Sequence, residues 1–388
     1  MAMVEEARGS RRAVPAWPRS RQLALTAPRT VFEALFCVLL PLGAPAMIAL
    51  YLVGAYQPDP FTLDGKFFPD GGFLFDLHVM WKAGHDVVTG SSPYPFVYPA
   101  PAAFFMAPFG ALPWTAAVVA FTLLLVAALV LALRLLGVRD WRCYALALGS
   151  LPMASSIMIG TLSPLLALAA AVAWRYRDRT FAVAGAIVAV VVTKIFLWPL
   201  VIWLVATRRF RAAAMTVVLG IAVTFGSWAA LGFDGLRDYG HGLERVAGLV
   251  QERSYSLFAL FRLLGLSAGP ARIVVALLTL AALAAIVLVA RGSDGDRRSF
   301  VLALGVGLLA SPIVWMHYLV LLIVPIALYR PRLSAAWLVP VAYWVLQGQE
   351  NDGSAGKIIL MLGLTAAGVA LAMRQRREPA PVPALSSP

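Results

Sequence analysis

The chain has 388 residues, of which 61% are hydrophobic and only 13% are charged, and its mean hydropathy is +0.82. Soluble globular domains carry about 25% charged residues, so the composition excludes that class. The formal net charge of +13 would suit a nucleic-acid-binding protein, but the distribution of the basic residues argues against one.

The basic residues form seven clusters that alternate with apolar runs. The clusters span residues 8–29, 134–142, 175–179, 208–211, 291–298, 330–332 and 374–377. Short loops rich in Lys and Arg lie on the cytoplasmic side of membrane proteins. We therefore predict that both termini are cytoplasmic, that the number of spans is even, and that the positive charge contacts anionic lipid headgroups rather than nucleic acid.

Three segments follow one another along the chain. Residues 1–30 form a Pro/Arg/Ser-rich arm that we predict to be disordered and cytoplasmic, and residues 374–388 form a similar tail. Residues 31–373 contain repeated apolar runs. Because a bilayer core about 30 Å thick needs roughly 20 such residues per helix, we predict one all-α polytopic domain with about ten to twelve transmembrane helices. The first apolar run is too long for a cleavable signal peptide, and Cys37 and Cys143 lie in or beside apolar runs, so we expect no disulfide.

The first loop, residues 55–98, holds the densest group of ionisable side chains. They are Asp59, Asp64, Lys66, Asp70, Asp76, His78, Lys82, His85 and Asp86. Within this loop, residues 73–89 predict a short amphipathic helix. Leu77, Met80, Trp81 and Gly84 would share its apolar face. The topology places the loop outside the cell, where such a helix can lie in the membrane interface.

Asp76 lies in the first turn of the predicted helix, and two roles suit it. It can complement the helix dipole or cap the helix. It can also act as a general base at the membrane surface, where partial burial and a nearby cation would set its pKa. We interpret Asp59, Asp64 and Asp70 as solvated loop charges.

The sequence gives little indication of a bound metal or cofactor. His78 and His85 have no cysteine near them, which makes a weak zinc pattern, and we interpret both as interfacial polar groups. No glycine-rich phosphate loop follows a strand. We therefore expect no cofactor and no metal requirement.

Two later stretches place polar groups within apolar surroundings. Lys194 interrupts an apolar stretch, so it either snorkels to the interface or contacts a phosphate at the outer mouth of the bundle. Trp315 and His317 follow a Ser-Pro pair near an outer helix end. They can belong to an aromatic belt, or His317 can hydrogen-bond a sugar or a phosphate.

Two arginines fall on the outer side, against the topological trend. Arg253 and Arg262 follow the longer outer loop. An arginine binds a phosphate well through its planar fork. The alternative is an ion pair with Glu252 or Glu244.

Taken in order, these residues resemble the pattern of glycosyltransferase family 87, over about residues 31–373. The resemblance rests on Asp76, Ala83, Gly90, Pro93-Tyr94, Tyr98-Pro99, Lys194, Ser254–Arg262, Ser311-Pro312, Trp315 and His317. The chain departs from the pattern at three places: its first proline after Lys194 is Pro199, Tyr255 replaces a polar residue, and Tyr318 replaces a second histidine. These departures lie where substrate would be held.

The resemblance implies an integral-membrane enzyme of the GT-C type. It would be an inverting glycosyltransferase that moves a sugar, mannose first, from a polyprenyl-phosphate donor to a lipid or glycan acceptor outside the cell. Asp76 would be the catalytic base. The substrate-binding residues would be Lys194, His317, Arg253, Arg262, Tyr94, Ser254 and Trp315. Phe104, Phe105, Met106 and Trp198 would line the groove for the lipid donor.

Other functions stay open on sequence alone. The sugar can be arabinofuranose instead of mannose. A lipid or solute transporter is the alternative from another class, but transporters place ionisable groups near the bilayer midplane, commonly on repeated segments. Here the ionisable groups gather at one end of the predicted bundle. That distribution favours the enzyme.

Overall fold

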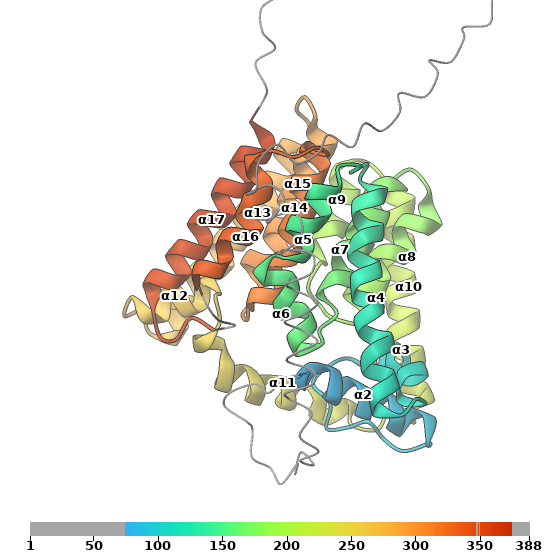
Figure 1. Ribbon diagram of the computed structural model, residues 1–388. Coiled ribbons are helices and arrows are strands. Elements are labelled where there is room, and N and C mark those ends of the chain that lie inside the picture. Colours follow the sequence, from blue (N-terminus) through green and yellow to red (C-terminus); the bar gives the residue numbers. More distant parts are fainter. Residues whose placement is uncertain (1–73, 347, 349, 375–388) are drawn as a thin grey trace, which may run out of the picture.

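The computed structural model describes residues 74–346, 348 and 350–374 (Figure 1). Within them the fold is helical and contains no strand. The predicted N-terminal arm, the first apolar run, Asp59, Asp64 and Asp70, and the tail from residue 375 lie outside the described residues.

The helices follow one another with short connections. They are α2 (Phe75–Val88), α3 (Ala100–Gly110), α4 (Trp114–Leu135), α5 (Trp141–Leu148), α6 (Leu151–Ile159), α7 (Ser163–Arg175), α8 (Thr180–Val191), α9 (Pro199–Ala206), α10 (Phe210–Ala230), α11 (Leu236–Val250), η1 (Gln251–Arg253), α12 (Leu257–Leu263), α13 (Ala268–Val289), α14 (Gly295–Ala310), η2 (Met316–Leu322), α15 (Ile323–Tyr329), η3 (Ala335–Leu338), α16 (Val339–Ala342), η4 (Tyr343–Leu346) and α17 (Ala355–Met373).

Several of these helices can cross a bilayer. Within the described part of the chain, α4, α10, α13 and α17 are long and apolar enough, and α5 with α6 make a fifth candidate bent by 53°. The chain is therefore an all-α, multi-pass membrane protein, as predicted. The expected number of ten to twelve spans stays a prediction, because further apolar segments such as α7 and α8 are shorter than a single span requires.

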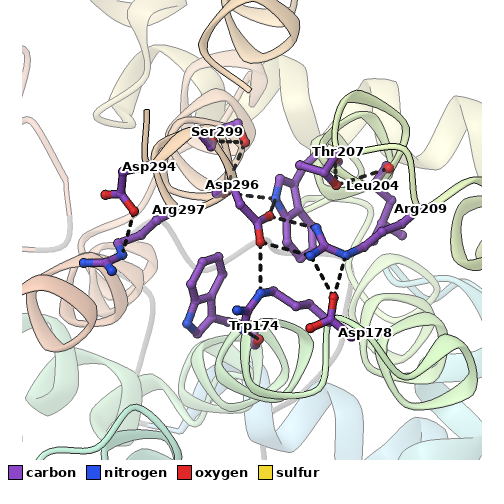
Figure 2. A network of polar contacts seen from close by, with 12 residues as sticks. Trp174, Asp178, Leu204, Thr207, Arg209, Asp294, Asp296, Arg297 and Ser299 are labelled. Atoms are coloured by element: carbon purple, nitrogen blue, oxygen red, sulfur yellow. Dashed lines mark hydrogen bonds and ion pairs between the residues drawn. The ribbon is translucent and has the colours of Figure 1, made fainter. Parts of the chain in front are cut away.

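The end of the bundle opposite α2 is held together by a half-buried aspartate. Asp296, in the first turn of α14, accepts hydrogen bonds from Arg209 to Oδ1 at 2.8 Å and to Oδ2 at 3.0 Å (Figure 2). Arg177 and Trp203 donate to the same carboxylate at 2.9 Å and 3.0 Å. Arg209 also pairs with Asp178 at 2.9 Å. This cluster joins the α7–α8 connection, α9 and the start of α10 to α14.

The basic clusters within the described residues lie at this same end. Arg177 and Arg209 meet at Asp296. Asp140 accepts a hydrogen bond from the backbone N–H of Leu333 at 3.2 Å, which brings the 134–142 and 330–332 clusters together. Figure 1 shows α2 and α11 at the opposite end of the upright helices. The clusters predicted to share one side of the membrane therefore share one end of the bundle.

Helix α2 is the amphipathic helix that the sequence predicted. Leu77 and Met80 are fully buried, and no Cβ fits at Gly84, where it would meet the backbone oxygen of Met106 in α3. Gly160, at the end of α6, similarly leaves space for Leu77. The apolar face of α2 thus packs on α3 and α6 instead of facing lipid, which fixes the position of its first turn.

Candidate functional site

A cavity of about 680 Å³ lies at the α2 end of the bundle. Its walls come from α2, the break between α8 and α9, α11, the segment before and within η2, and the loop before α17. The polar side chains that line it are Asp76, Tyr98, Lys194, Tyr239, Arg253, Ser311, Trp315, His317, Tyr318, Glu350 and Asp352. The fold therefore gathers groups from five distant parts of the sequence.

Asp76 lies in the first turn of α2 and points into this cavity. The residue that caps α2 is Leu74, and no side chain caps the helix, so Asp76 does not serve as a cap. Leu74 is anchored by its backbone N–H, which donates to the carbonyl oxygen of Met158 at 2.7 Å. Tyr98 donates a hydrogen bond to Oδ2 of Asp76 at 3.0 Å.

The surroundings of Asp76 act on its pKa in opposite directions. Burial raises the pKa, while the positive charge of Lys194 and the hydrogen bond from Tyr98 lower it, and the net result is a raised pKa. A carboxyl group with a raised pKa binds a proton more readily than a solvated aspartate does. This property is typical of carboxylates that exchange protons during a reaction.

Lys194 lies in the turn between α8 and α9 and faces the same cavity. Its Nζ lies 4.2 Å from the ring centre of Tyr318 and 5.8 Å from that of Tyr98. Among the residues described, no carboxylate comes within 4.0 Å of this ammonium group. The charge is thus held by aromatic rings and not by an ion pair.

The segment before and within η2 forms another wall of the cavity. Trp315 and His317 line the cavity there, and the ring of His317 meets Tyr318 edge-on with the ring centres 4.8 Å apart. The segment is held in place because the backbone N–H of Tyr255 donates to the carbonyl oxygen of Val314 at 2.7 Å. His317 is only 3% exposed. An aromatic-belt residue would face the lipid and would therefore be more exposed.

An aliphatic stripe on α11 forms a further wall of the cavity. Leu243, Val246, Ala247 and Val250 line the cavity, and their spacing places them on one face of the helix. Phe104, Phe105, Met106 and Trp198, the groove expected from the sequence, do not line it. Met106 is instead buried against α2, because α3 packs there.

Arg253 reaches the cavity at the C-terminal end of α11. Its Nε donates to Oε2 of Glu350 at 2.6 Å. The predicted ion pair with Glu252 or Glu244 is therefore wrong for Arg253, but it is confirmed for Arg262, which pairs with Glu252. Glu350 and Asp352 lie in the loop before α17 and line the cavity beside Arg253.

Three of the predicted substrate-binding residues lie away from the cavity. Tyr94 stacks on Trp228, with ring centres 4.6 Å apart. Arg262 pairs with Glu252 at 2.7 Å. Ser254 is buried, and its hydroxyl oxygen lies 2.8 Å from the carbonyl oxygen of Gln251 and 3.0 Å from the hydroxyl oxygen of Ser256. We therefore assign structural roles to these three side chains.

Sequence reasoning gave no site role to six polar side chains of the cavity: Tyr98, Tyr239, Ser311, Tyr318, Glu350 and Asp352. Tyr98 and Ser311 belonged to the family pattern and Tyr318 was a departure from it, but none of the three had been given a role of its own. Glu350 and Asp352 could have been identified from the sequence, because they are ionisable residues in a short loop between apolar segments.

The histidines of α2 lie on its outer surface together with Trp81, whose expected place on the apolar face is therefore wrong. His85 stacks on Trp81 with ring centres 5.5 Å apart, and its Nδ1 lies 3.0 Å from the carbonyl oxygen of Gly110. His78 meets Trp114 edge-on. Within the described ranges, no group of three or more His, Cys, Asp or Glu side chains could hold a metal ion.

Comparisons with known proteins agree with the pattern of residues. The family model of glycosyltransferase family 87 matches residues 96–312. A relative from Mycobacterium tuberculosis (strain CDC 1551 / Oshkosh), a polyprenol-phosphate-mannose-dependent α-(1-2)-phosphatidylinositol pentamannoside mannosyltransferase, is 28% identical, and the alignment covers 75% of this chain and 70% of the relative. No solved structure matches the chain at a comparable level. Asp76, Trp315 and His317 lie outside the range that the family model matches.

Proposed function

The chain belongs to glycosyltransferase family 87, and on that premise we propose that it moves a hexose from a polyprenyl-phosphate donor to a hydroxyl group of a lipid or glycan acceptor. The sugar that we propose is mannose, in line with the name of the mycobacterial relative. One observation supports this proposal above others: Asp76 and the unpaired Lys194 face one cavity that also has an aliphatic wall.

Asp76 is the catalytic base in this proposal. Its ionised carboxylate accepts the proton of the acceptor hydroxyl group as that oxygen attacks the anomeric carbon of the donor. The bond between the anomeric carbon and the phosphate oxygen breaks, and the lipid phosphate leaves with the electron pair. Attack on the face opposite the leaving group inverts the configuration. General-base catalysis of this kind typically contributes 10²–10⁴-fold to the rate.

Lys194 stabilises the leaving group. The lipid phosphate gains negative charge as its bond to the sugar breaks, and a fixed cation in a partly dehydrated cavity lowers the energy of that state. Lys194 can meet this charge because its ammonium group is held over Tyr318 and not by a carboxylate. His317, on the neighbouring wall, is the second donor.

The lipid chain of the donor needs an apolar surface. The stripe of Leu243, Val246, Ala247 and Val250 on α11 provides one inside the cavity. We propose that the cavity faces the extracytoplasmic side, because the basic clusters lie at the opposite end of the bundle and basic loops are cytoplasmic. Lipid-linked sugars reach that side, whereas cytosolic nucleotide sugars do not.

The test is a transfer assay with the purified protein in proteoliposomes. Polyprenyl-phosphate-linked mannose, arabinofuranose and glucose are offered with octyl α-D-mannopyranoside as the acceptor, with and without EDTA. We expect mannose transfer that EDTA leaves unchanged. The absence of transfer from every donor would overturn the proposed function.

The general base is tested in the same assay with Asp76→Asn. We expect this variant to lose at least about 100-fold in kcat, the lower limit for general-base catalysis, while it unfolds at the wild-type temperature. Asp86→Asn is the matched control, because Asp86 lies in the last turn of the same helix and pairs with Lys82 outside the cavity. Wild-type turnover by Asp76→Asn would exclude the base assignment.

A further inference from the structure

The cavity has two polar ends that hold their charges differently. At one end the opposite charges of Asp76 and Lys194 interact, but no carboxylate of the described residues lies within 4.0 Å of the Lys194 ammonium group. At the other end Arg253 pairs with Glu350 at 2.6 Å, and Asp352 pairs with Lys357. Each charge at this second end is already offset by another, so the end is close to neutral yet rich in hydrogen-bond donors and acceptors.

The helix α11 separates the two ends. Tyr239, near its start, lines the cavity close to Tyr98, the partner of Asp76. Val250, at its end, directly precedes the turn that contains Arg253. A rise of 1.5 Å per residue puts about 16 Å between Tyr239 and Val250. The second polar end therefore lies at the far end of α11 from Tyr239, where a further part of a substrate would extend.

The second end is also rigidly built. Asn351 is fully buried, and its side-chain amide donates to the carbonyl oxygens of Glu252 at 2.8 Å and Ser254 at 2.6 Å. Its backbone N–H donates to the carbonyl oxygen of Arg253 at 2.9 Å. Two loops almost 100 residues apart in sequence are thus held together on both sides of the Arg253–Glu350 pair. Such support is typical of side chains that bind a ligand in a fixed geometry.

A phosphate does not suit this end, because Glu350 and Asp352 would repel it and Arg253 is already occupied. Hydroxyl groups suit it, since each can donate to a carboxylate and accept from the guanidinium group of Arg253. A sugar ring offers several hydroxyl groups at once and brings no charge.

We propose that Arg253, Glu350 and Asp352 form the acceptor subsite of the cavity and bind the hydroxyl groups of an uncharged sugar unit of the acceptor. This inference rests on the proposed function. It leaves the phosphate of the donor to Lys194 and His317 and removes Arg253 from that role. It also selects an acceptor that already contains sugar.

The test separates the two substrates kinetically. Glu350→Gln keeps the shape of the side chain and removes its charge. With polyprenyl-phosphate mannose as donor and the octyl glycoside of an α-linked mannotriose as acceptor, whose terminal ring can reach Asp76 while an inner ring lies at Glu350, we expect KM for the acceptor to rise about tenfold, the effect of losing one hydrogen bond to a charged group. We expect KM for the donor to stay within twofold of the wild-type value.

Glu252→Gln is the matched control, because Glu252 forms an ion pair of the same kind with Arg262 just outside the cavity. It should leave both KM values unchanged. If Glu350→Gln unfolds, Asp352→Asn replaces it, and protection of the wild-type protein against thermal unfolding by the octyl mannotrioside provides an independent readout that Asp352→Asn should abolish.

The possible failures are distinguishable. No transfer by the wild-type protein overturns the proposed function. Transfer with an unchanged acceptor KM in Glu350→Gln and Asp352→Asn overturns the acceptor subsite alone. A rise in donor KM and not in acceptor KM would show that Arg253 and Glu350 bind the lipid phosphate, which also overturns the inference.

Discussion

The hydroxyl group of Tyr98 donates a hydrogen bond to Oδ2 of Asp76 at 3.0 Å. Tyr98 lies in the connection between α2 and α3, so this bond ties the loop to the first turn of the helix that it follows. The bond favours the ionised form of Asp76, since a carboxylate accepts it better than a protonated carboxyl group does. Tyr98 thereby influences the pH range in which Asp76 can accept a proton.

Tyr98→Phe should move the pH profile of the enzyme. Burial raises the pKa of Asp76, and Lys194 and Tyr98 lower it, so removing the hydroxyl group raises this pKa further. Because the base must be ionised, activity is lost as pH falls through its pKa, and the acidic limb of log(kcat/KM) should shift to higher pH by about one unit.

The control for this change is Tyr94→Phe. Tyr94 lies in the same connection but stacks on Trp228 and does not line the cavity. Its removal should leave the acidic limb in place. A shift to lower pH in Tyr98→Phe, or equal shifts in the two variants, would show that the hydrogen bond does not act on the base.

Lys194→Gln should weaken binding of the lipid phosphate. We expect Ki for inhibition by polyprenyl phosphate and KM for the donor to rise about tenfold or more, since a charge-assisted contact is lost. KM for the acceptor should not change. Lys194→Arg, which keeps the charge, should recover part of the loss.

Lys82→Gln is the matched control, because Lys82 is exposed and pairs with Asp86 on the outer side of α2. Equal effects of the two glutamine substitutions would attribute them to net surface charge. Unaltered inhibition by polyprenyl phosphate in Lys194→Gln would place the phosphate elsewhere.

The sequence predicted those features that depend on short-range patterns. The apolar runs predicted an all-α membrane protein, and the spacing of Leu77, Met80 and Gly84 predicted α2 to within a few residues of its ends. Lys194 was identified because a charge within an apolar stretch is unusual.

Features that depend on long-range packing were not predictable in this way. Arg253 and Glu350 are 97 residues apart, and no local pattern distinguishes Glu350 from the nearer Glu252 as a partner. The apolar wall of the cavity was predicted at the wrong place for the same reason. Met106 and the lining residues of α11 are all apolar, so the sequence does not distinguish them. Because α3 packs on α2, Met106 is buried there and α11 lines the cavity.

Asp296→Asn should destabilise the end of the bundle opposite the cavity. The carboxylate accepts hydrogen bonds from Arg209, Arg177 and Trp203 (Figure 2), and the amide cannot accept them all. The cluster is half-buried, so we expect a loss of about 2 kcal/mol, between the values for exposed and for fully buried pairs. Thermal unfolding in nanodiscs should show a lower Tm.

Asp294→Asn serves as the comparison, because Asp294 pairs with Arg297 at 3.4 Å and is more exposed. It should change the Tm little. Donor and acceptor KM values measured below the unfolding transition should stay at wild-type levels in both variants. Equal Tm values for Asp296→Asn and Asp294→Asn would contradict the role of the cluster as a clamp.

The side of the membrane that the cavity faces can be decided with two cysteine reporters. Gly292→Cys lies among the basic clusters and Asp238→Cys lies on the outer face of α11, and both positions are exposed. Cys37 and Cys143 are first replaced by alanine, so that each reporter is the only thiol. Because basic loops are cytoplasmic, a membrane-impermeant maleimide should label Asp238→Cys in intact cells, and should label Gly292→Cys only after the membrane is permeabilised.

This experiment tests the direction of the whole site. The basic clusters and the cavity lie at opposite ends of one bundle (Figure 1), so a single orientation determines both. The reverse labelling pattern would put Asp76 and Lys194 on the cytoplasmic side. A cytoplasmic cavity would be accessible to nucleotide sugars, and the choice of a polyprenyl-phosphate donor would then lose its topological support while the geometry of the base and the cation would stand.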